Sequence, residues 1–344
     1  MAEMTPYLRD ILQVCSENLP WEKLSGCNVL ITGATGLIGG GLVDVLMNHP
    51  HCSCQVYALG RNEERAQKRF ADYWNDDAFH FIQNDISVPL SYNTQFDYII
   101  HAASNASPNF FKEKPVEVMK ANLLGMVNLM EYGLSHNMKR MLYVSSGEVY
   151  GEGNGQKFKE TDSGYVDCAT ARACYPSSKR AAETLAISYA EEYGVDVVIA
   201  RPCHTYGPYF TESDNRVYAQ FIRNVLNDEN IVMKSPGTQF RSWLYVVDCV
   251  NAILTILLKG ANGQVYNVAD ENSNITIREL AEIIAHIGRD HVVFNIDEHY
   301  GNTATITHAI FSTAKLTKLG WMPRFSLENG LRQTIESLII REKI

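Results

Sequence analysis

Short apolar runs alternate with amphipathic stretches along the chain from residue 27 onward. The runs are rich in β-branched and aromatic residues and end in Gly, Asn, Asp or Ser, which predicts strands. The stretches between them carry apolar residues at helical spacing and predict helices beginning near Leu37, Asn62, Pro115 and Arg172. The predicted strands cover residues 28–32, 55–59, 80–84, 98–101, 140–145 and 196–201. The alternation favours an α/β protein with a doubly wound, Rossmann-type parallel sheet.

The two ends of the chain differ from this pattern. In residues 1–25, Thr5 can cap a helix and Pro6 suits its first turn, which predicts an N-terminal helical extension. Its expected buried face carries Leu8, Ile11, Leu12 and Cys15. Residues 26–200 are expected to form the Rossmann domain. Residues 201–344, where Pro, Gly and Asn interrupt shorter elements, are expected to form mainly a second lobe over the carboxyl ends of the strands, with some segments returning to the sheet.

Composition narrows the class of protein. The 344 residues are 46% hydrophobic and carry a net charge of −9, which excludes disorder and nucleic-acid binding through overall positive charge. Apolar runs are too short for a signal peptide or a membrane-spanning helix, so we expect a cytoplasmic protein without a membrane partner. The eight cysteines include no CxxC pair, and Cys52 and Cys54 lack partners at ligand spacing, so we expect reduced thiols and no metal.

A glycine-rich turn follows the first predicted strand. Glycines permit a tight turn and a close approach of the backbone to a pyrophosphate, and the following helix supplies N–H donors to the anion. The position of this turn, between a strand and a helix at the start of an α/β domain, predicts a dinucleotide site. The candidate residues are Gly33, Thr35, Gly36, Leu37, Ile38 and Gly39.

The end of the second strand bears on the choice between NAD and NADP. Gly60 stands where NAD enzymes often carry an acid for the ribose 2′-hydroxyl, and Arg61 could pair with a 2′-phosphate. Arg61 therefore favours NADP, and the alternative is that it is a solvated residue at a helix start. Asp85, after the third strand, could accept the adenine amino group or simply cap a turn.

Tyr175 and Lys179 lie one helical turn apart on one predicted helix face. A nearby ammonium lowers the pKa of a phenol, so Tyr175 could act as a base toward a carbinol or as an acid toward a ketone. Together with the glycine turn upstream, the pair indicates a dehydrogenase.

An ordered set of motifs now identifies a family resemblance. The motifs are GATGLIGG, NDIS, HAAS, KANLLG, SSGEVYGE, YPSSK, ARPCHTYGP and FRSWLYVVD. With them the chain resembles extended short-chain dehydrogenases/reductases of the NAD-dependent epimerase/dehydratase family. The resemblance implies a bound nicotinamide cofactor, with NAD as the usual one, and a catalytic set of Asn122, Ser146, Tyr175 and Lys179. It also implies cofactor contacts from Asn62, Ile86, Ala102, Ala103, Ser104 and Pro202.

Within that family the chain is most similar to UDP-glucuronate decarboxylases, in the order and spacing of segments that include DISVPL, RACYPSSKRAAETL and GTQFRSWLYVVDCVNAI. The resemblance implies that Tyr175 deprotonates the sugar C4 hydroxyl, that hydride passes to the nicotinamide, and that the 4-keto acid loses carbon dioxide before hydride returns. Glu148 and Arg241 would position the substrate or handle protons. A homodimer would form through a four-helix bundle of residues 115–136 and 172–192. The implied substrate residues are Ser107, Glu148, His204, Arg216 and Arg241.

Three departures from the family pattern leave alternatives open. Gly147 replaces the Asp of 4,6-dehydratases and the usual Ser of decarboxylases, His204 replaces an Asn, and NTATITHAIFSTAK replaces a basic stretch. Loss of the Asp argues against sugar dehydration. The triplet Ser146-Gly147-Glu148 has no side chain at its middle position. Together with Arg61, this triplet motivates an NADPH-dependent reductase of a nucleotide-linked keto sugar, for example a CDP-sugar. A nucleotide-sugar 4-epimerase and a non-catalytic dinucleotide sensor are the further alternatives.

Overall fold

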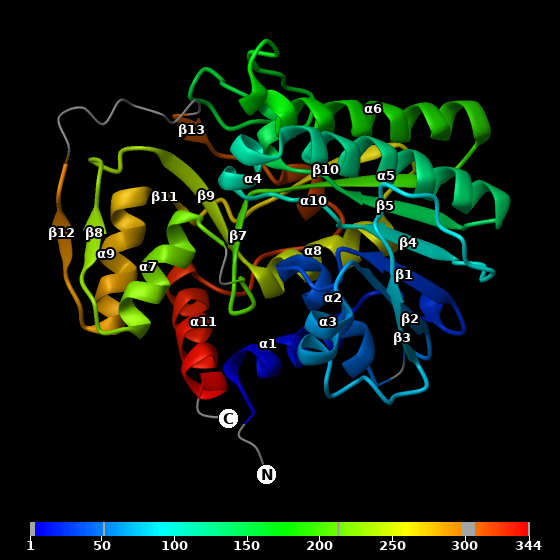
Figure 1. The fold of residues 1–344 in the computed structure, drawn as a ribbon, viewed down its shortest axis with the longest axis horizontal. Coiled ribbons are helices and arrows are strands. Elements are labelled where there is room, and N and C mark those ends of the chain that lie inside the picture. Colours follow the sequence, from blue (N-terminus) through cyan, green and yellow to red (C-terminus); the bar gives the residue numbers. More distant parts are fainter. Residues whose placement is uncertain (1–3, 51, 212–213, 297–306, 343–344) are drawn as a thin grey trace.

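A seven-stranded, fully parallel sheet forms the centre of the molecule (Figure 1). The computed structural model describes residues 4–50, 52–211, 214–296 and 307–342. The strand order is β10-β6-β5-β4-β1-β2-β3. The strands are β1 (Asn28–Thr32), β2 (Gln55–Gly60), β3 (Phe79–Gln83), β4 (Tyr98–His101), β5 (Arg140–Val144), β6 (Val197–Pro202) and β10 (Gln264–Val268). The predicted α/β class and Rossmann-type sheet are therefore confirmed.

The connections run outward in both directions from the centre of the sheet. The chain passes from β1 to β2 and β3 on one side, and from β4 to β5, β6 and β10 on the other. The direction reverses between β1 and β4, and open α/β sheets bind ligands beyond the carboxyl ends of their strands at such a point. The turns after β1 and β4 therefore form the floor of the expected site.

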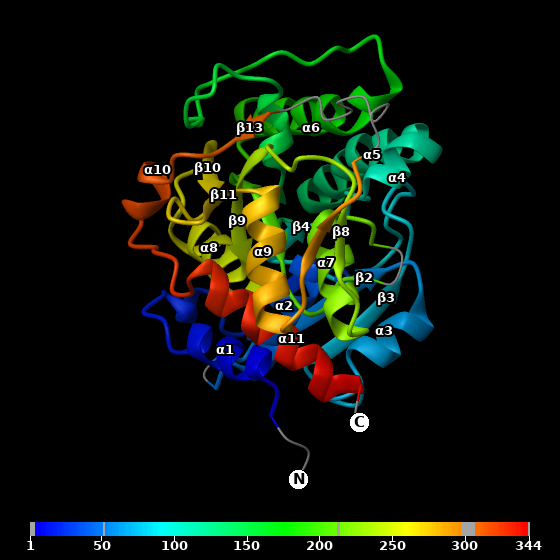
Figure 2. The same ribbon diagram turned by 90° about the vertical axis from the view of Figure 1, so that its left-hand side faces the viewer.

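Helices cover both faces of the sheet, so β1 is apolar on both sides. Val29 and Ile31 belong to a core shared with α2 (Leu37–Asn48) and α8 (Val246–Lys259). Leu30 belongs to a second core shared with α5 (Pro115–Ser135) and α6 (Cys174–Tyr193). Figure 2 shows α5 and α6 together on the side of the sheet opposite α1. In the described part of the chain, no helix is both long and apolar enough to cross a membrane.

The predicted N-terminal helix is α1 (Pro6–Cys15), capped by the Thr5 hydroxyl, which accepts from the Leu8 N–H at 3.3 Å. The prediction of its buried face was partly wrong, because Leu8 is only partly buried and Leu12 is 38% exposed. The helix instead packs with Tyr7, Ile11, Val14 and Cys15 inward. In this orientation the Tyr7 hydroxyl donates a buried hydrogen bond of 2.6 Å to Asp44 on α2, which favours Tyr7 on the inner face.

Shorter elements after β6 form a lobe beside the sheet, at the left of Figure 1. Its central strand, β9 (Phe240–Tyr245), pairs with β7 (His204–Tyr206), β11 (Asn274–Thr276) and β13 (His308–Ala309). The remaining elements after β6 are α7 (Val217–Leu226), β8 (Ile231–Met233), α9 (Ile277–Gly288), β12 (Val292–Phe294), α10 (Ala314–Thr317) and α11 (Leu327–Glu342). Two further helices are α3 (Glu63–Arg69), after β2, and α4 (Pro108–Glu113), after β4.

Candidate active site

The glycine turn after β1 packs its backbone against the segment that follows β4. Gly33 has a φ of +66°, and a Cβ on it would lie 2.6 Å from Cα of Ala103, so only glycine fits. A Cβ on Gly39 would overlap the carbonyl group of Gly33. Gly36 is the N-cap of α2, whose free N–H groups favour an anion, and Thr35, Leu37 and Ile38 lie in the same turn. The turn has the backbone geometry that a pyrophosphate site requires.

Two features beside this turn fit a dinucleotide. Ser104 follows β4, and its buried hydroxyl has no hydrogen-bond partner among the described residues. A cavity of about 270 Å³ lies near the carboxyl ends of β2 and β3. It is lined by Arg61, Asp85, Ser87, Val116, Glu117, Lys120 and Ala121. The other predicted cofactor residues, Asn62, Ile86, Ala102 and Pro202, also lie at or just beyond the carboxyl ends of strands of the sheet.

Arg61 is held by acidic groups in this cavity. Its guanidinium donates to Oε1 of Glu117 at 2.9 Å and lies 3.9 Å from Oδ2 of Asp85. Glu117 belongs to the first turn of α5, and the hydrogen bond from Arg61 lowers its pKa. Asp85 accepts from the N–H and the hydroxyl of Ser87, as the turn-cap interpretation expected, while its place in the cavity is compatible with an adenine contact.

Arg65 was not singled out by the sequence analysis, although it also contacts the glycine turn. Its guanidinium donates to the carbonyl oxygen of Thr35 at 2.8 Å. Asn62 caps α3 and accepts from the Arg65 N–H at 2.8 Å, which fixes the start of this helix. The predicted helix start at Asn62 already placed Arg65 in its first turn, and that signal could have identified it.

Tyr175 and Lys179 lie on α6 and are almost fully buried. The Lys179 ammonium donates to the carbonyl oxygen of Val144, the last residue of β5, at 2.8 Å, and lies 5.8 Å from the centre of the Tyr175 ring. Asn122, on α5, donates to the Ser178 hydroxyl at 2.9 Å, and its own Oδ1 is buried without a partner among the described residues. Helices α5 and α6 thus bring Asn122 close to the Tyr175 and Lys179 pair.

The pKa of the Tyr175 phenol is raised, contrary to the lowering expected from Lys179. Burial raises the pKa of Tyr175 to about 12, while a hydrogen bond with Ser146 lowers it and the Glu148 carboxylate raises it. Burial also lowers the pKa of Lys179 to about 7, against a smaller raising effect of Glu183. Desolvation therefore dominates both groups, because neither charged form has enough compensating partners at this depth.

A short 3₁₀ helix, Gly147–Tyr150, places a carboxylate next to Tyr175. The Ser146 hydroxyl caps this helix by accepting from the Glu148 N–H at 3.1 Å. Arg172 donates to the two Glu148 carboxylate oxygens at 3.2 and 3.1 Å. Arg172 could not be assigned this role from the sequence, because it lies 24 positions after Glu148 and no local pattern links the two residues.

The lobe contributes a part-buried histidine near two arginines. His204 begins β7, and its Nδ1 is buried without a partner among the described residues. Burial, together with the positive charges of Arg241 and Arg216, lowers the pKa of His204 to about 3. His204 is therefore neutral at physiological pH and remains able to donate or accept a hydrogen bond.

Hydrogen bonds position the remaining predicted substrate residues in the lobe and at its border with the Rossmann part. Arg216, the N-cap of α7, donates to both carboxylate oxygens of Asp214. Arg241, on β9, donates to the carbonyl oxygen of Thr307 at 3.0 Å. Ser107, before α4, donates to Oδ1 of Asn215 at 2.8 Å. The first two keep guanidinium groups close to His204, and the third joins the Rossmann part to the lobe.

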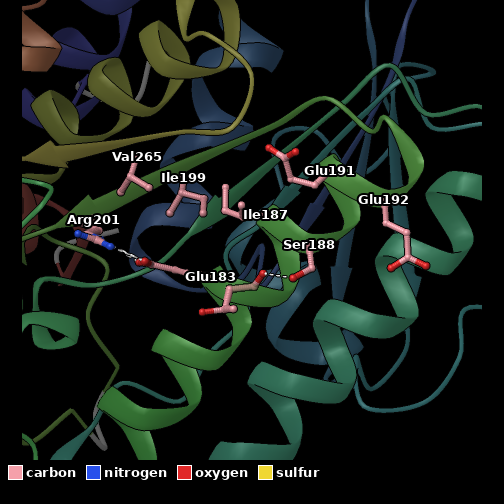
Figure 3. A pocket seen from close by; sticks show the side chains of 9 residues that line it. Glu183, Ile187, Ser188, Glu191, Glu192, Ile199, Arg201 and Val265 are labelled. Carbon is pink, nitrogen blue, oxygen red and sulfur yellow. Dashed lines mark hydrogen bonds and ion pairs between the residues drawn. The ribbon is translucent and has the colours of Figure 1, made fainter.

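A larger cavity, of about 600 Å³, lies between α6, β6 and β10 (Figure 3). Arg201 and Glu183 pair at one end of it, with Nε and Oε1 2.9 Å apart. None of the predicted cofactor or substrate residues lines this cavity. In the described part of the chain, no group of His, Cys, Asp or Glu is arranged to hold a metal ion.

The fold and the site together define an NAD-dependent enzyme of the extended short-chain dehydrogenase/reductase class. The model of the NAD dependent epimerase/dehydratase family matches residues 29–269, and the chain belongs to this family.

Curated relatives are similar over most of the chain. UDP-glucuronic acid decarboxylase 6 of Arabidopsis thaliana is 32% identical over 318 residues, which are 92% of this chain and 90% of the relative. UDP-glucuronic acid decarboxylase 1 of Danio rerio is 33% identical over 312 residues, or 90% and 72% of the two chains. The similarity to named decarboxylases thus spans both the Rossmann part and the lobe.

Solved structures share the whole architecture. A UDP-N-acetylglucosamine 4-epimerase from Methanobrevibacter ruminantium, in complex with UDP-N-acetylmuramic acid, superposes with a TM-score of 0.80 at 26% identity, over 92% of this chain and 99% of that one. A dTDP-glucose 4,6-dehydratase from Bacillus anthracis, in complex with NAD, has a TM-score of 0.77 at 22% identity, over 92% and 98% of the two chains. The second likeness shows the fold alone.

Proposed function

We propose that the protein decarboxylates UDP-glucuronate through a 4-keto intermediate. The observation that carries this proposal is the position of the 3₁₀ turn with Ser146 and Glu148, both of which lie close enough to the buried phenol of Tyr175 to shift its pKa. It puts an acid–base phenol, a hydroxyl and a carboxylate at one place beyond β5. The named activity of the curated relatives points to the same substrate.

The residues divide the reaction into proton transfer and positioning. The nicotinamide cofactor, when bound, supplies the hydride acceptor for C4 and returns the hydride at the end. Tyr175 accepts the C4 hydroxyl proton as the hydride leaves, assisted by the Ser146 hydroxyl. The resulting 4-keto acid releases carbon dioxide because the electron pair of the broken C–C bond is delocalised onto the C4 carbonyl. C5 of the enolate then takes up a proton from solvent, which gives the 4-ketopentose. Tyr175 returns its proton to the C4 oxygen when the hydride is restored.

Several residues are proposed to hold the substrate and the cofactor. Arg216 and Arg241 would bind the substrate diphosphate, and His204 would donate a hydrogen bond to it. Glu148 and Ser107 would orient the sugar. The glycine turn from Gly33 to Gly39 would hold the cofactor diphosphate, with Ala102, Ala103 and Ser104 against the cofactor.

The test is carbon dioxide release from UDP-glucuronate by the purified protein saturated with NAD. We expect stoichiometric carbon dioxide and UDP-pentose, with no net change in the cofactor. Release of no carbon dioxide would overturn the decarboxylase proposal, and a UDP-hexuronic acid changed only at C4 would instead indicate the epimerase.

For the cofactor, we infer that NAD is preferred over NADP. Arg61 was the feature that favoured NADP, but its guanidinium is engaged by Glu117 and lies near Asp85. A 2′-phosphate bound by Arg61 would meet both carboxylates, and like charges repel. Glu117 on α5 thus provides the negative charge that many NAD enzymes carry at the position of Gly60, at the end of β2. Equilibrium binding of NAD and NADP tests this directly.

An NADPH-dependent reductase is the second candidate. It is favoured by the absence of an acid at position 60 and by the guanidinium of Arg65, which donates to the carbonyl oxygen of Thr35 and adds positive charge beside the glycine turn. It predicts that NADPH is consumed once for each nucleotide-linked keto sugar, for example a CDP-4-keto sugar, that is reduced. Tight binding of NAD with no net NADPH oxidation would exclude it.

We also propose a homodimer through a four-helix bundle of α5 and α6 from two copies. The outer surface of α5 carries Val116, Met119 and Leu124, which are 65%, 38% and 42% exposed. A second copy would cover these apolar side chains. Sedimentation equilibrium tests the proposal, and a Leu124→Glu variant is expected to shift the protein toward the monomer.

A further inference from the structure

The ring of Phe311 occupies the space into which a side chain at Gly147 would extend. Its φ lies outside the left-handed region, so the backbone conformation itself would accept any L residue. A Cβ on Gly147 would lie 2.7 Å from Cε1 and 3.2 Å from Cε2 of Phe311, and closer still to its Cζ. The glycine between Ser146 and Glu148 is therefore matched to a residue more than 160 positions later in the chain.

Phe311 cannot easily move away from Gly147. Its side chain is 1% exposed, and its ring centroid lies 5.7 Å from that of Tyr150 and 6.2 Å from that of Phe158. The backbone on both sides is fixed as well, because the Phe158 N–H donates to Ile310 O and the Ser312 N–H donates to Phe158 O, each at 2.9 Å. A side chain at position 147 would have to displace a ring that is held from several directions.

We propose that Phe311 is a specificity-determining residue that closes position 147 to any proton-donating side chain. This inference rests on the proposed nucleotide-sugar reaction. With position 147 closed, Tyr175, Ser146 and Glu148 are the proton-transfer groups that this part of the site offers.

The closure favours one reaction of a 4-keto sugar over another. Carbon dioxide leaves a β-keto acid as a neutral molecule, so its departure needs no acid on the leaving group. Loss of the C6 hydroxyl is different, because a base must remove the C5 proton and an acid must protonate the departing oxygen, which leaves as water while a C5=C6 bond forms. Phe311 thus excludes from position 147 the acid that elimination requires, while decarboxylation does not require that acid.

A double-mutant cycle on thermal stability tests the steric part of the inference. The variants are Gly147→Ser, Phe311→Ala and the combination of the two. Gly147→Ser should lower the melting temperature by several degrees in the wild-type background, where it overpacks the site, and by clearly less in the Phe311→Ala background. Equal losses in both backgrounds would overturn the proposal. This outcome does not depend on which substrate the enzyme uses.

The chemical part is tested with UDP-glucose, which has a C6 hydroxyl and no carboxylate. The Gly147→Asp/Phe311→Ala variant, saturated with NAD, should convert it to a product lighter by one water, as measured by mass spectrometry. In this reaction Tyr175 takes the C4 hydroxyl proton and Glu148 takes the C5 proton. The introduced carboxylic acid protonates the leaving oxygen. The hydride taken from C4 is then added to C6, and Glu148 returns its proton to C5.

Two single variants are the matched controls for this experiment. Phe311→Ala provides room without an acid and Gly147→Asp provides an acid without room, and neither should give the dehydrated product. Dehydration by Phe311→Ala alone, or none by a double variant that folds and binds NAD like the wild type, would contradict the inference. Failure of the wild type to release carbon dioxide from UDP-glucuronate would instead overturn the proposed function.

Discussion

The ring of Phe111 stacks on the ring of Tyr175, with centroids 4.7 Å apart and planes inclined by 21°. Phe111 lies on α4 and is buried. The guanidinium of Arg172 lies 4.9 Å from the centre of the Phe111 ring. The stack fixes the plane of the phenol and keeps water from one of its faces. It also contributes to the burial that raises the pKa of Tyr175.

Replacing Tyr175 by Phe should abolish turnover and leave cofactor binding intact. The phenylalanine keeps the stack on Phe111 but has no proton to exchange, and general acid–base groups typically contribute about 10²–10⁴ in rate. Single-turnover hydride transfer and the dissociation constant of NAD are the two measurements. A variant that turns over at more than a tenth of the wild-type rate would remove Tyr175 from its proposed role.

Lys179→Met should stabilise the protein while inactivating it. The folded-state pKa of Lys179 is lowered from 10.5 to about 7, so the unfolded chain binds more protons between these pH values. Stability of the wild type therefore rises with pH across that window, and below about pH 7 the full cost of the buried charge is present. The melting temperature of Lys179→Met should exceed that of the wild type at pH 6, with a difference that shrinks toward pH 10.

The exposed Lys112 on α4 supplies the control for that measurement. Lys112→Met should show no comparable pH-dependent difference. A Lys179→Met variant less stable than the wild type at every pH would show that the hydrogen bond to Val144 outweighs the cost of burial.

Glu117→Gln should move cofactor preference toward NADP. The substitution frees Arg61 from its ion pair and removes a negative charge from the cavity. We expect the ratio of NADP to NAD affinity to rise by about tenfold, which corresponds to about 1.4 kcal/mol. Glu113→Gln, an exposed acid on α4 outside the cavity lining, is the matched control. An unchanged ratio would argue against the assigned role of Glu117.

Arg172→Ala should raise KM for UDP-glucuronate by about tenfold. Without Arg172 the Glu148 carboxylate is no longer balanced and repels the carboxylate of the substrate, while the neutral sugar of UDP-glucose is unaffected. Initial rates with UDP-glucuronate and competition by UDP-glucose measure the two effects. Equal weakening of both ligands would point to a general loss of packing against Phe111.

Tyr7→Phe should lower the free energy of unfolding by about 2 kcal/mol. The Tyr7 hydroxyl donates to the Asp44 carboxylate inside the core, and a hydrogen bond to a charged group contributes about 1.5–3 kcal/mol. Urea unfolding measures the change. Leu12→Ala, on the exposed side of the same helix, should change stability by much less, and an equal effect of the two would refute the assigned orientation of α1.

Several parts of the fold could be predicted because their signals are local. Strands β1 and β4 were predicted with their observed bounds, and β2, β3, β5 and β6 within one residue at each end, since each is a short apolar run between turn-forming residues. The need for glycine at Gly33 follows from the turn itself. Strand β10 was not predicted, because its five residues carry little pattern of their own and their place beside β6 depends on pairing across the sheet.

The sequence by itself therefore determined the first six strands of the Rossmann sheet, the glycine turn and the spacing of Tyr175 and Lys179, each of which depends on residues within a few positions of one another. Only the tertiary structure decided that Arg172 meets Glu148, that Glu117 holds Arg61 and that Phe311 fills the space beside Gly147. These contacts join segments 24 to 164 positions apart, and their energies depend on burial and shape. Neither quantity exists until the chain has folded.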